Sequence, residues 1–377
     1  MKINIKELKT IVSKLNVAIE KNKVNPKSGW VELYAVNGLL TLKVANYDYF
    51  LEMKLNVECD SSESIHATVV ADTFIPLVSK LDDNTMTIFE RGNTLVFASD
   101  TNEYTFPIIK ELGKVKSIDT ISFNQLHCKH TNNKGYSIAS IANTNAKGLV
   151  DSVFSKDIQQ FIYIDDIGAL TFTENIYVNN FETTCDLQFK MLLNCTQAKL
   201  LKIFEDYDTV DILTEISATY ETSYKVMFRT DNISLILITQ SAALTDKFPA
   251  IRLRQLADRS NIVHAVIDKK KLDKALARLM VFDKRFDITV MNYSKLVFGT
   301  ESLKLVSIKN NNYEVVPYIS AENAIEHEAI IRFADLVKQL KAINTKEVDI
   351  GYGTSSAIVI NGNVKQLIPE IRMVDKV

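Results

Sequence analysis

Three short stretches of this sequence carry side chains whose types and spacing could do chemistry. The adjacent carboxylates Asp165 and Asp166 could act as a general acid and a general base. The segment His127-Cys128-Lys129-His130 offers imidazole and thiolate groups, which bind transition metals. Residues 269–278 hold four lysines and one arginine, which could neutralise the phosphates of a nucleic acid.

The first two stretches favour a non-catalytic interpretation. The two aspartates lie in a polar turn between predicted strands, where we expect water to solvate them. The histidine–cysteine segment has none of the spacings of zinc sites, so we interpret it as a polar loop. The other histidines (His66, His264 and His327) are isolated, and the motifs GxxxxGK(S/T), GxGxxG, HExxH and GxSxG are absent from the sequence. We predict no catalytic residues, no cofactor and no bound metal, although an enzyme with an unrecognised site remains an alternative.

The composition is that of a globular protein with more than one domain. The chain has 377 residues, 46% of them hydrophobic and 24% charged. Domains usually hold about 100–200 residues, so we expect two or three. No apolar run approaches the ~20 residues that cross a bilayer, and the opening MKINIKELKT does not look like a secretory signal. Cys59, Cys128, Cys185 and Cys195 are scattered without a CxxC pair, which indicates a reducing compartment and predicts a cytoplasmic protein.

An amphipathic helix followed by alternating strands recurs three times along the chain. The first set opens with IKELKTIVSKLNVAIEK, whose apolar residues fall mostly on one helical face. Its second helix has Asp72 as a candidate N-cap, which would put Pro76 in the first turn. In the middle set, residues 135–145 are the candidate first helix. The five clearest helices span residues 5–21, 72–82, 197–206, 268–279 and 331–343.

Repeats of this size are whole domains, so the sequence predicts an α+β fold with three similar domains over residues 1–116, 117–252 and 253–377. The net charge of −2 argues weakly against nucleic-acid binding. However, the five predicted helices together carry a net charge of +6, which leaves −8 for the rest of the chain. A surface built from these helices would attract phosphate although the whole protein is acidic.

Six segments, by their order and spacing, resemble the beta subunit of bacterial DNA polymerase III, the sliding clamp: MKINIKELKTIVSKL, VVADTFIPLVSKLDD, TMTIFERGNTLVFAS, FTENIYV, DKFPAIR and QLIPEIRM. The resemblance runs the full length. Residues 174–177 replace the aspartate, glycine, histidine and arginine usual in the family, Ala250 and Ile251 replace aspartate and tyrosine, and one residue is added near Glu370. We interpret the chain as a divergent member, and its many Asn, Lys and Ile residues suggest a phage or mobile element.

The resemblance implies a ring that encircles double-stranded DNA. In the clamp fold each domain places two helices on the inner wall and antiparallel sheets outside, and two chains join head to tail as a homodimer. Such a ring is a DNA polymerase processivity factor and not an enzyme, and it touches phosphates without reading sequence. The candidate DNA contacts are Lys21, Lys23, Lys80, Lys199, Lys202, Lys269, Lys270, Lys271, Lys274, Arg278, Lys338 and Lys341.

The resemblance also implies a pocket for peptides from the replicative DNA polymerase, the clamp loader and other partners. Such grooves combine apolar anchors with a few polar groups. The matching positions are Ile158, Thr173, Asn175, Ile176, Tyr177, Val178, Pro249, Leu253, Arg332, Thr354, Ser356, Ile368, Pro369 and Glu370. Ordinary sheet packing is the alternative for the apolar members Ile158, Ile176, Val178 and Ile368.

The dimer contact implied by the resemblance joins edge strands of the first and third domains. Here these are the strands near Thr101–Pro107 and Ser302–Lys309. An alternative from another class is a β-rich multidomain structural or interaction protein that does not encircle DNA. The mass in solution separates the two, because a clamp should be a dimer of about 85 kDa, twice the 42.6 kDa of one chain.

Overall fold

The computed structural model describes most of the chain. The described residues are 1–19, 26–60, 63–110, 125–131, 161–172, 178–182, 187, 189–215, 223–258, 261, 263–283, 293–308, 311–353 and 357–371. They form two compact units. Unit 1 draws on residues 1–139, 186–189 and 199–243, and unit 2 on residues 140–185, 190–198 and 244–377. Within the described ranges, no helix is long and apolar enough to span a membrane.

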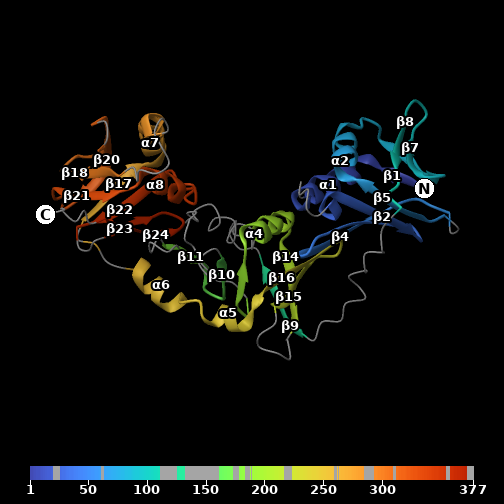
Figure 1. Ribbon diagram of the computed structural model, residues 1–377, viewed down its shortest axis with the longest axis horizontal. Helices are drawn as coiled ribbons and strands as arrows, with labels where there is room; N and C mark the ends of the chain where they lie inside the picture. The colour runs from blue at the N-terminus through green and yellow to red at the C-terminus, as the bar shows by residue number, and fades with distance from the viewer. Residues whose placement is uncertain are drawn as a thin grey trace. The chain divides into compact units, whose positions relative to one another are not determined.

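Two antiparallel sheets make up most of unit 1 (Figure 1). The smaller has the order β1 (Lys2–Asn4), β6 (Thr85–Arg91), β7 (Thr94–Ala98), β8 (Glu103–Pro107). The larger has the order β5 (Ile65–Val70), β2 (Trp30–Val36), β3 (Leu39–Ala45), β4 (Tyr49–Asn56), β16 (Ile233–Ser241), β15 (Ser223–Arg229), β14 (Thr209–Glu215), β9 (Gln125–Thr131). Side chains alternate between the two faces of each strand, as in β5, where Ile65, Ala67 and Val69 are buried.

Helices α1 (Ile5–Leu15) and α2 (Ala71–Lys80) pack against each other beside these sheets. Asn4 caps α1 by accepting a hydrogen bond from the Glu7 N–H at 3.2 Å. The helix predicted to reach residue 21 ends at Leu15, and a 3-10 turn over Asn16–Ala18 follows.

The start of α2 differs from the prediction. Strand β5 runs directly into the helix, so Val70 is the N-cap residue and Asp72 lies in the first turn. A carboxylate there still faces the positive end of the helix dipole. Pro76 sits inside the helix and is exposed, so the carbonyl of Asp72 lacks its usual donor at a place that water can reach.

Unit 2 is built on one long antiparallel sheet (Figure 1). Its order is β13 (Met191–Leu193), β10 (Ile162–Ile164), β11 (Gly168–Phe172), β12 (Val178–Glu182), β24 (Lys365–Pro369), β23 (Ala357–Asn361), β22 (Glu347–Tyr352), β17 (Val263–Asp268), β20 (Tyr313–Glu322), β19 (Ser302–Ser307), β18 (Ser294–Phe298), β21 (His327–Ile331). Helices α7 (Lys269–Asp283) and α8 (Phe333–Leu340) pack together beside the β17–β24 part. The short α5 (Ala242–Asp246) precedes α6 (Ala250–Ala257), which packs on β11, β12 and β24.

One further helix, α4 (Cys195–Leu200), continues as a 3-10 helix over Leu201–Phe204. Asn194 and Gln197 form a reciprocal cap at its start. The Gln197 N–H donates to Asn194 Oδ1 at 2.8 Å, and the Asn194 N–H donates to Gln197 Oε1 at 3.0 Å. Asn194 is thus the N-cap residue of α4.

The chain repeats one order of elements. Residues 2–107 run strand, helix, four strands, helix and three strands, and residues 263–369 run in the same order. The pairing repeats too, as β1-β6-β7-β8 and β17-β22-β23-β24. Residues 125–241 keep this strand order with α4 as the second helix, whereas the first helix expected at 135–145 lies outside the described residues. We refer to the three sets as repeats 1, 2 and 3; domain boundaries at residues 116 and 252 stay a prediction.

Strands far apart in the sequence join neighbouring repeats. The last strand of repeat 2, β16, pairs with β4 of repeat 1, and the last strand of repeat 3, β24, pairs with β12 of repeat 2. Each of these pairs joins the last strand of one repeat to the strand at the β4 position of another. The last strand of repeat 1, β8, and the strand of repeat 3 at the β4 position, β20, are not used in such a pair. In the described part of the chain β8 pairs only with β7, and Tyr313–Pro317 of β20 pair only with β19.

The dimer strand predicted at Ser302–Lys309 is therefore wrong. Strand β19 lies between β18 and β20, so both of its edges are already paired. The open edge belongs to β20, where Tyr313 and Val315 are 59% and 50% exposed. Periodicity could not separate the two strands, because an edge strand and an inner strand share the same alternation.

Candidate nucleic-acid and peptide interfaces

Among the helices predicted from the sequence, α7 carries the highest density of basic side chains. Its apolar residues at helical spacing are buried in the core of unit 2, namely Leu272, Ala275, Leu276 and Leu279. The opposite face exposes Lys270, Lys271, Lys274 and Arg278. A row of cations along little more than two helical turns suits a phosphate backbone better than base edges.

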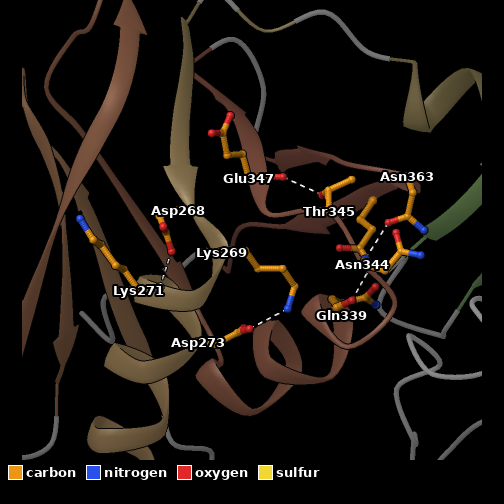
Figure 2. A network of polar contacts seen from close by, with 10 residues as sticks. Asp268, Lys269, Lys271, Asp273, Gln339, Asn344, Thr345, Glu347 and Asn363 are labelled. Carbon is orange, nitrogen blue, oxygen red and sulfur yellow. Dashed lines mark hydrogen bonds and ion pairs between the residues drawn. The ribbon is translucent and has the colours of Figure 1, made fainter.

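Polar contacts fix the start of α7 (Figure 2). Asp268 accepts a hydrogen bond from the Lys271 N–H at 2.8 Å, which caps the helix. The Lys269 N–H donates to the carbonyl of Lys346 at 3.0 Å. The Lys269 ammonium lies 2.6 Å from Asp273 Oδ2, one turn further along α7. These contacts turn Lys269 toward the protein rather than toward a ligand.

Arg278 is also engaged. It donates two hydrogen bonds to Glu314 of β20, Nε to Oε1 at 2.6 Å and Nη2 to Oε2 at 2.8 Å. These hydrogen bonds, helped by the positive charge, hold the pKa of Glu314 below its usual value. Lys270, Lys271 and Lys274 make no ion pair with any residue that the structure describes. They are the side chains of α7 most available to phosphates.

Five of the other predicted DNA contacts lie on shorter helices or at their ends. Lys80, Lys199, Lys202 and Lys341 are exposed at or near helix ends. Lys338 is half-buried in α8, and Lys21 and Lys23 lie outside the described residues. Lys6 was missed by the sequence prediction, although it is exposed on α1 and the helical spacing of Leu8 and Val12 could have found it.

The predicted peptide pocket maps in part to an apolar cluster beneath α6. The cluster contains Tyr163, Leu170, Val178, Leu192, Phe248, Ala250, Leu253, Ala257, Val359 and Leu367. Val178 and Leu253 are 0% and 4% exposed, so both are packing residues here. Ile368 is buried as well, but in the core under α7 and α8, because successive strand residues point to opposite faces.

An ion pair fastens α6 to the turn between β10 and β11. The Arg254 guanidinium donates to both oxygens of Asp165, at 2.7 and 2.9 Å, and the two side chains are only 12% and 9% exposed. Asp165 Oδ1 also accepts the N–H groups of Ile167 and Gly168, at 3.0 and 3.2 Å. The expectation that Asp165 is solvated is therefore wrong, because the partner that buries it is 89 residues away in the sequence. Asp166 is exposed, as predicted.

The remaining pocket residues are dispersed. Arg332 lies 3.5 Å from Asp335, and Glu370 lies 3.0 Å from His327 Nε2. Pro249 and Pro369 are half-buried. Ile158, Thr173, Asn175, Ile176, Tyr177, Thr354 and Ser356 lie outside the described residues. Ile251, which was not predicted for the pocket, is 75% exposed on α6 and is the apolar side chain that a partner could reach there.

The chain was compared with known proteins by sequence and by fold. No protein-family model matches the sequence. The beta sliding clamp of Rickettsia bellii (strain RML369-C) is 33% identical over 93 residues, which is 24% of this chain and 24% of that protein. The DNA polymerase III beta subunit of Thermotoga maritima matches with a TM-score of 0.77 over 99% of both chains at 14% identity. That of Streptococcus pyogenes matches with a TM-score of 0.76 over 99% of both chains at 17% identity.

The chain has the sliding-clamp fold. The predicted α+β class is confirmed, and the structural likeness covers 99% of the chain. The segment matched in sequence spans only about a quarter of the curated relative. The sliding-clamp fold thus stands on architecture more than on shared residues.

Several histidines and the segment 127–130 have structural roles in this sliding-clamp fold. Residues 127–130 lie in strand β9, so their interpretation as a loop is wrong. The histidines regarded as isolated each contact a carboxylate, as His66–Glu32 at 2.8 Å, His264–Asp349 at 2.9 Å and His327–Glu370 at 3.0 Å. Over the described ranges no three metal-binding side chains gather into a cation site.

Proposed function

We propose that this protein is a DNA polymerase processivity factor, a sliding clamp that closes as a head-to-tail homodimer around duplex DNA in the cytoplasm. The observation that carries the proposal is the junction between repeats. Two equivalent strand pairs, β4–β16 and β12–β24, join the three repeats, and they leave β8 and β20 as open edges of complementary kinds. A second copy supplies the strand that each edge lacks.

Two hairpins give the expected register of β8 on its partner. In the β7–β8 hairpin the Ser99 N–H donates to Asn102 O at 2.8 Å, and in the β15–β16 hairpin the Thr230 N–H donates to Ile233 O at 2.9 Å. Counting from these matching turns, Pro107 of β8 takes the place of Ile238.

The same counting places β20. The β3–β4 hairpin closes between Asn46 and Tyr49, and the β19–β20 hairpin closes between Ser307 and Asn312. Tyr313 and Val315 then take the places of Phe50 and Glu52, which pair with Ile236 and Ser234. The expected pairs across the subunit contact are Thr105–Tyr313 and Glu103–Val315.

The basic helices support a role for the ring on DNA. Lys270, Lys271 and Lys274 of α7, together with Lys80, Lys199, Lys202 and Lys341, face solvent on elements that the fold repeats. Contacts of this kind give attraction that is independent of base sequence and falls with salt. Retention would then come from encirclement and not from affinity.

The comparisons also support partners of a replicative kind. The matched structures are beta subunits of DNA polymerase III, which favours a DNA polymerase and a clamp loader as the proteins that this ring would tether. The exposed Ile251 on α6 is the described apolar residue that we assign to peptide binding, beside the partly exposed Pro249.

Loading onto circular and linear DNA tests the proposal. The protein is placed on nicked circular duplex with a clamp loader, or by mild opening and closing of the ring, and is then washed at high salt. A clamp should stay on the circle and be lost when one cut makes the circle linear. Equal loss from both forms would contradict encirclement and favour an interaction protein without a ring.

A further inference from the structure

The β4–β16 junction shows what a complete contact between repeats contains. Five residue pairs, from Ile233–Met53 to Leu237–Tyr49, form its ladder. One further hydrogen bond closes each end. The Lys54 N–H donates to Asn232 O at 2.9 Å, and the Ile238 N–H donates to Asp48 O at 2.8 Å. The donors of both end bonds are backbone N–H groups.

At the two open edges, both of these donor positions are prolines. Pro317 of β20 takes the place of Lys54, and Pro107 of β8 takes the place of Ile238. Proline has no backbone N–H. A contact between β8 and β20 in the same register therefore lacks both end bonds, while its interior positions keep their N–H groups.

The β12–β24 junction is intermediate in the number of end positions that have a backbone N–H. Pro369 of β24 occupies the Ile238 position, but Glu182 of β12 occupies the Lys54 position and retains its N–H. The three kinds of contact thus form a series with two, one and no end donors. The contact between subunits comes last in that series.

We infer that Pro107 and Pro317 shorten the time for which two subunits stay joined, because they remove both end hydrogen bonds from the subunit contact. This inference rests on the proposed homodimer. Strand ends are where pairing first comes apart, and an end without its hydrogen bond exposes the next pair to water. Prolines at open edges also hinder pairing with wrong strands before the ring closes.

Subunit exchange measures the lifetime of this joint. Full-length protein made with natural nitrogen is mixed with protein labelled with nitrogen-15, and native mass spectrometry follows the mixed dimer over time. Pro107→Ala and Pro317→Ala each restore an N–H while removing apolar side-chain atoms, so slower exchange must come from the hydrogen bond. We expect each single variant to slow exchange several-fold and the double variant to slow it about tenfold or more.

Two further variants guard the interpretation. Pro76→Ala changes an exposed proline inside α2 and should leave exchange unchanged. Thr105→Pro removes an interior N–H of the expected contact and should speed exchange. Dimers of the double alanine variant that exchange as fast as the wild type, or faster, would overturn the inference and leave the ring intact. A wild-type protein that is monomeric would overturn both the inference and the proposed function.

Discussion

Single residues on α7 have separate roles although they share one charge. Lys269 is held by Asp273 of the same helix, whereas Arg278 is held by Glu314 and so ties α7 to β20. Lys270 and Lys274 extend from the same helix without such partners among the described residues. Binding a phosphate costs less free energy for an exposed lysine without a carboxylate partner than for a lysine whose ion pair must first be broken.

Charge reversal tests this division. Lys270→Glu combined with Lys274→Glu should weaken binding to short duplex DNA without lowering the melting temperature. The slope of log K against log salt should become shallower by up to about 0.9 for each phosphate that the protein no longer neutralises. Fluorescence anisotropy at several salt concentrations measures both effects. Lys247→Glu, at an exposed lysine between α5 and α6, is the control for either single reversal, and an equally weakened binding there would indicate a general effect of net charge.

The buried pair between Asp165 and Arg254 predicts a stability effect. Asp165→Asn keeps the shape of the side chain but leaves the arginine charge without its partner. We expect the free energy of unfolding to fall by about 3 kcal/mol, the lower part of the range for breaking a buried ion pair. Calorimetry should show a lower melting temperature, whereas Asp166→Asn at the exposed neighbour should change little. An unchanged melting temperature in the first variant would mean that water already screens the pair.

At the scale of elements, α6 shows how residues two positions apart on one helix have different roles. Leu253 is buried against β12 and β24, while Ile251 points into solvent. The helix has only eight residues, so its packing and its ion pairs hold it more than its intrinsic propensity does. Asp258 at its end forms an ion pair with Lys365 of β24, which adds a second tie.

Two substitutions separate these roles. Ile251→Asp should weaken binding of a clamp-binding peptide from a DNA polymerase by tenfold or more and leave the melting temperature unchanged. Leu253→Asp should lower the melting temperature instead, because it buries a carboxylate without a partner. Calorimetry and peptide anisotropy on both variants give the comparison. Peptide binding that survives Ile251→Asp would place the site elsewhere.

The elements predicted from periodicity are largely present, and the failures have local causes. Helical spacing located α1, α2, α7 and α8, because each has one buried stripe. The N-cap of α2 was misplaced because β5 passes into it without a loop. The helix of residues 250–257 was not predicted, because its segment DKFPAIR was used only for the family resemblance. Candidate site residues were harder, since Val178 and Ile368 look alike in sequence but lie in different cores.

For the whole molecule, the open edges make a prediction about mass. A single chain with β8 and β20 unpaired carries two strand edges that favour association. Sedimentation equilibrium should therefore give about 85 kDa, twice the mass of the 42.6 kDa chain, at micromolar concentration. A stable monomer would leave the edges unexplained and would favour a protein that does not form a ring.

The repeated junction has a consequence for stoichiometry. Strand β12 has the same position in repeat 2 that β20 has in repeat 3. A chain shortened to its first two repeats would therefore again have two open edges, at β8 and at β12. Three such shortened chains would supply the six repeats that two full chains supply. The number of copies in the assembly then follows from the number of repeats in one polypeptide. Fusing or splitting repeats could change the number of copies without altering any contact between repeats.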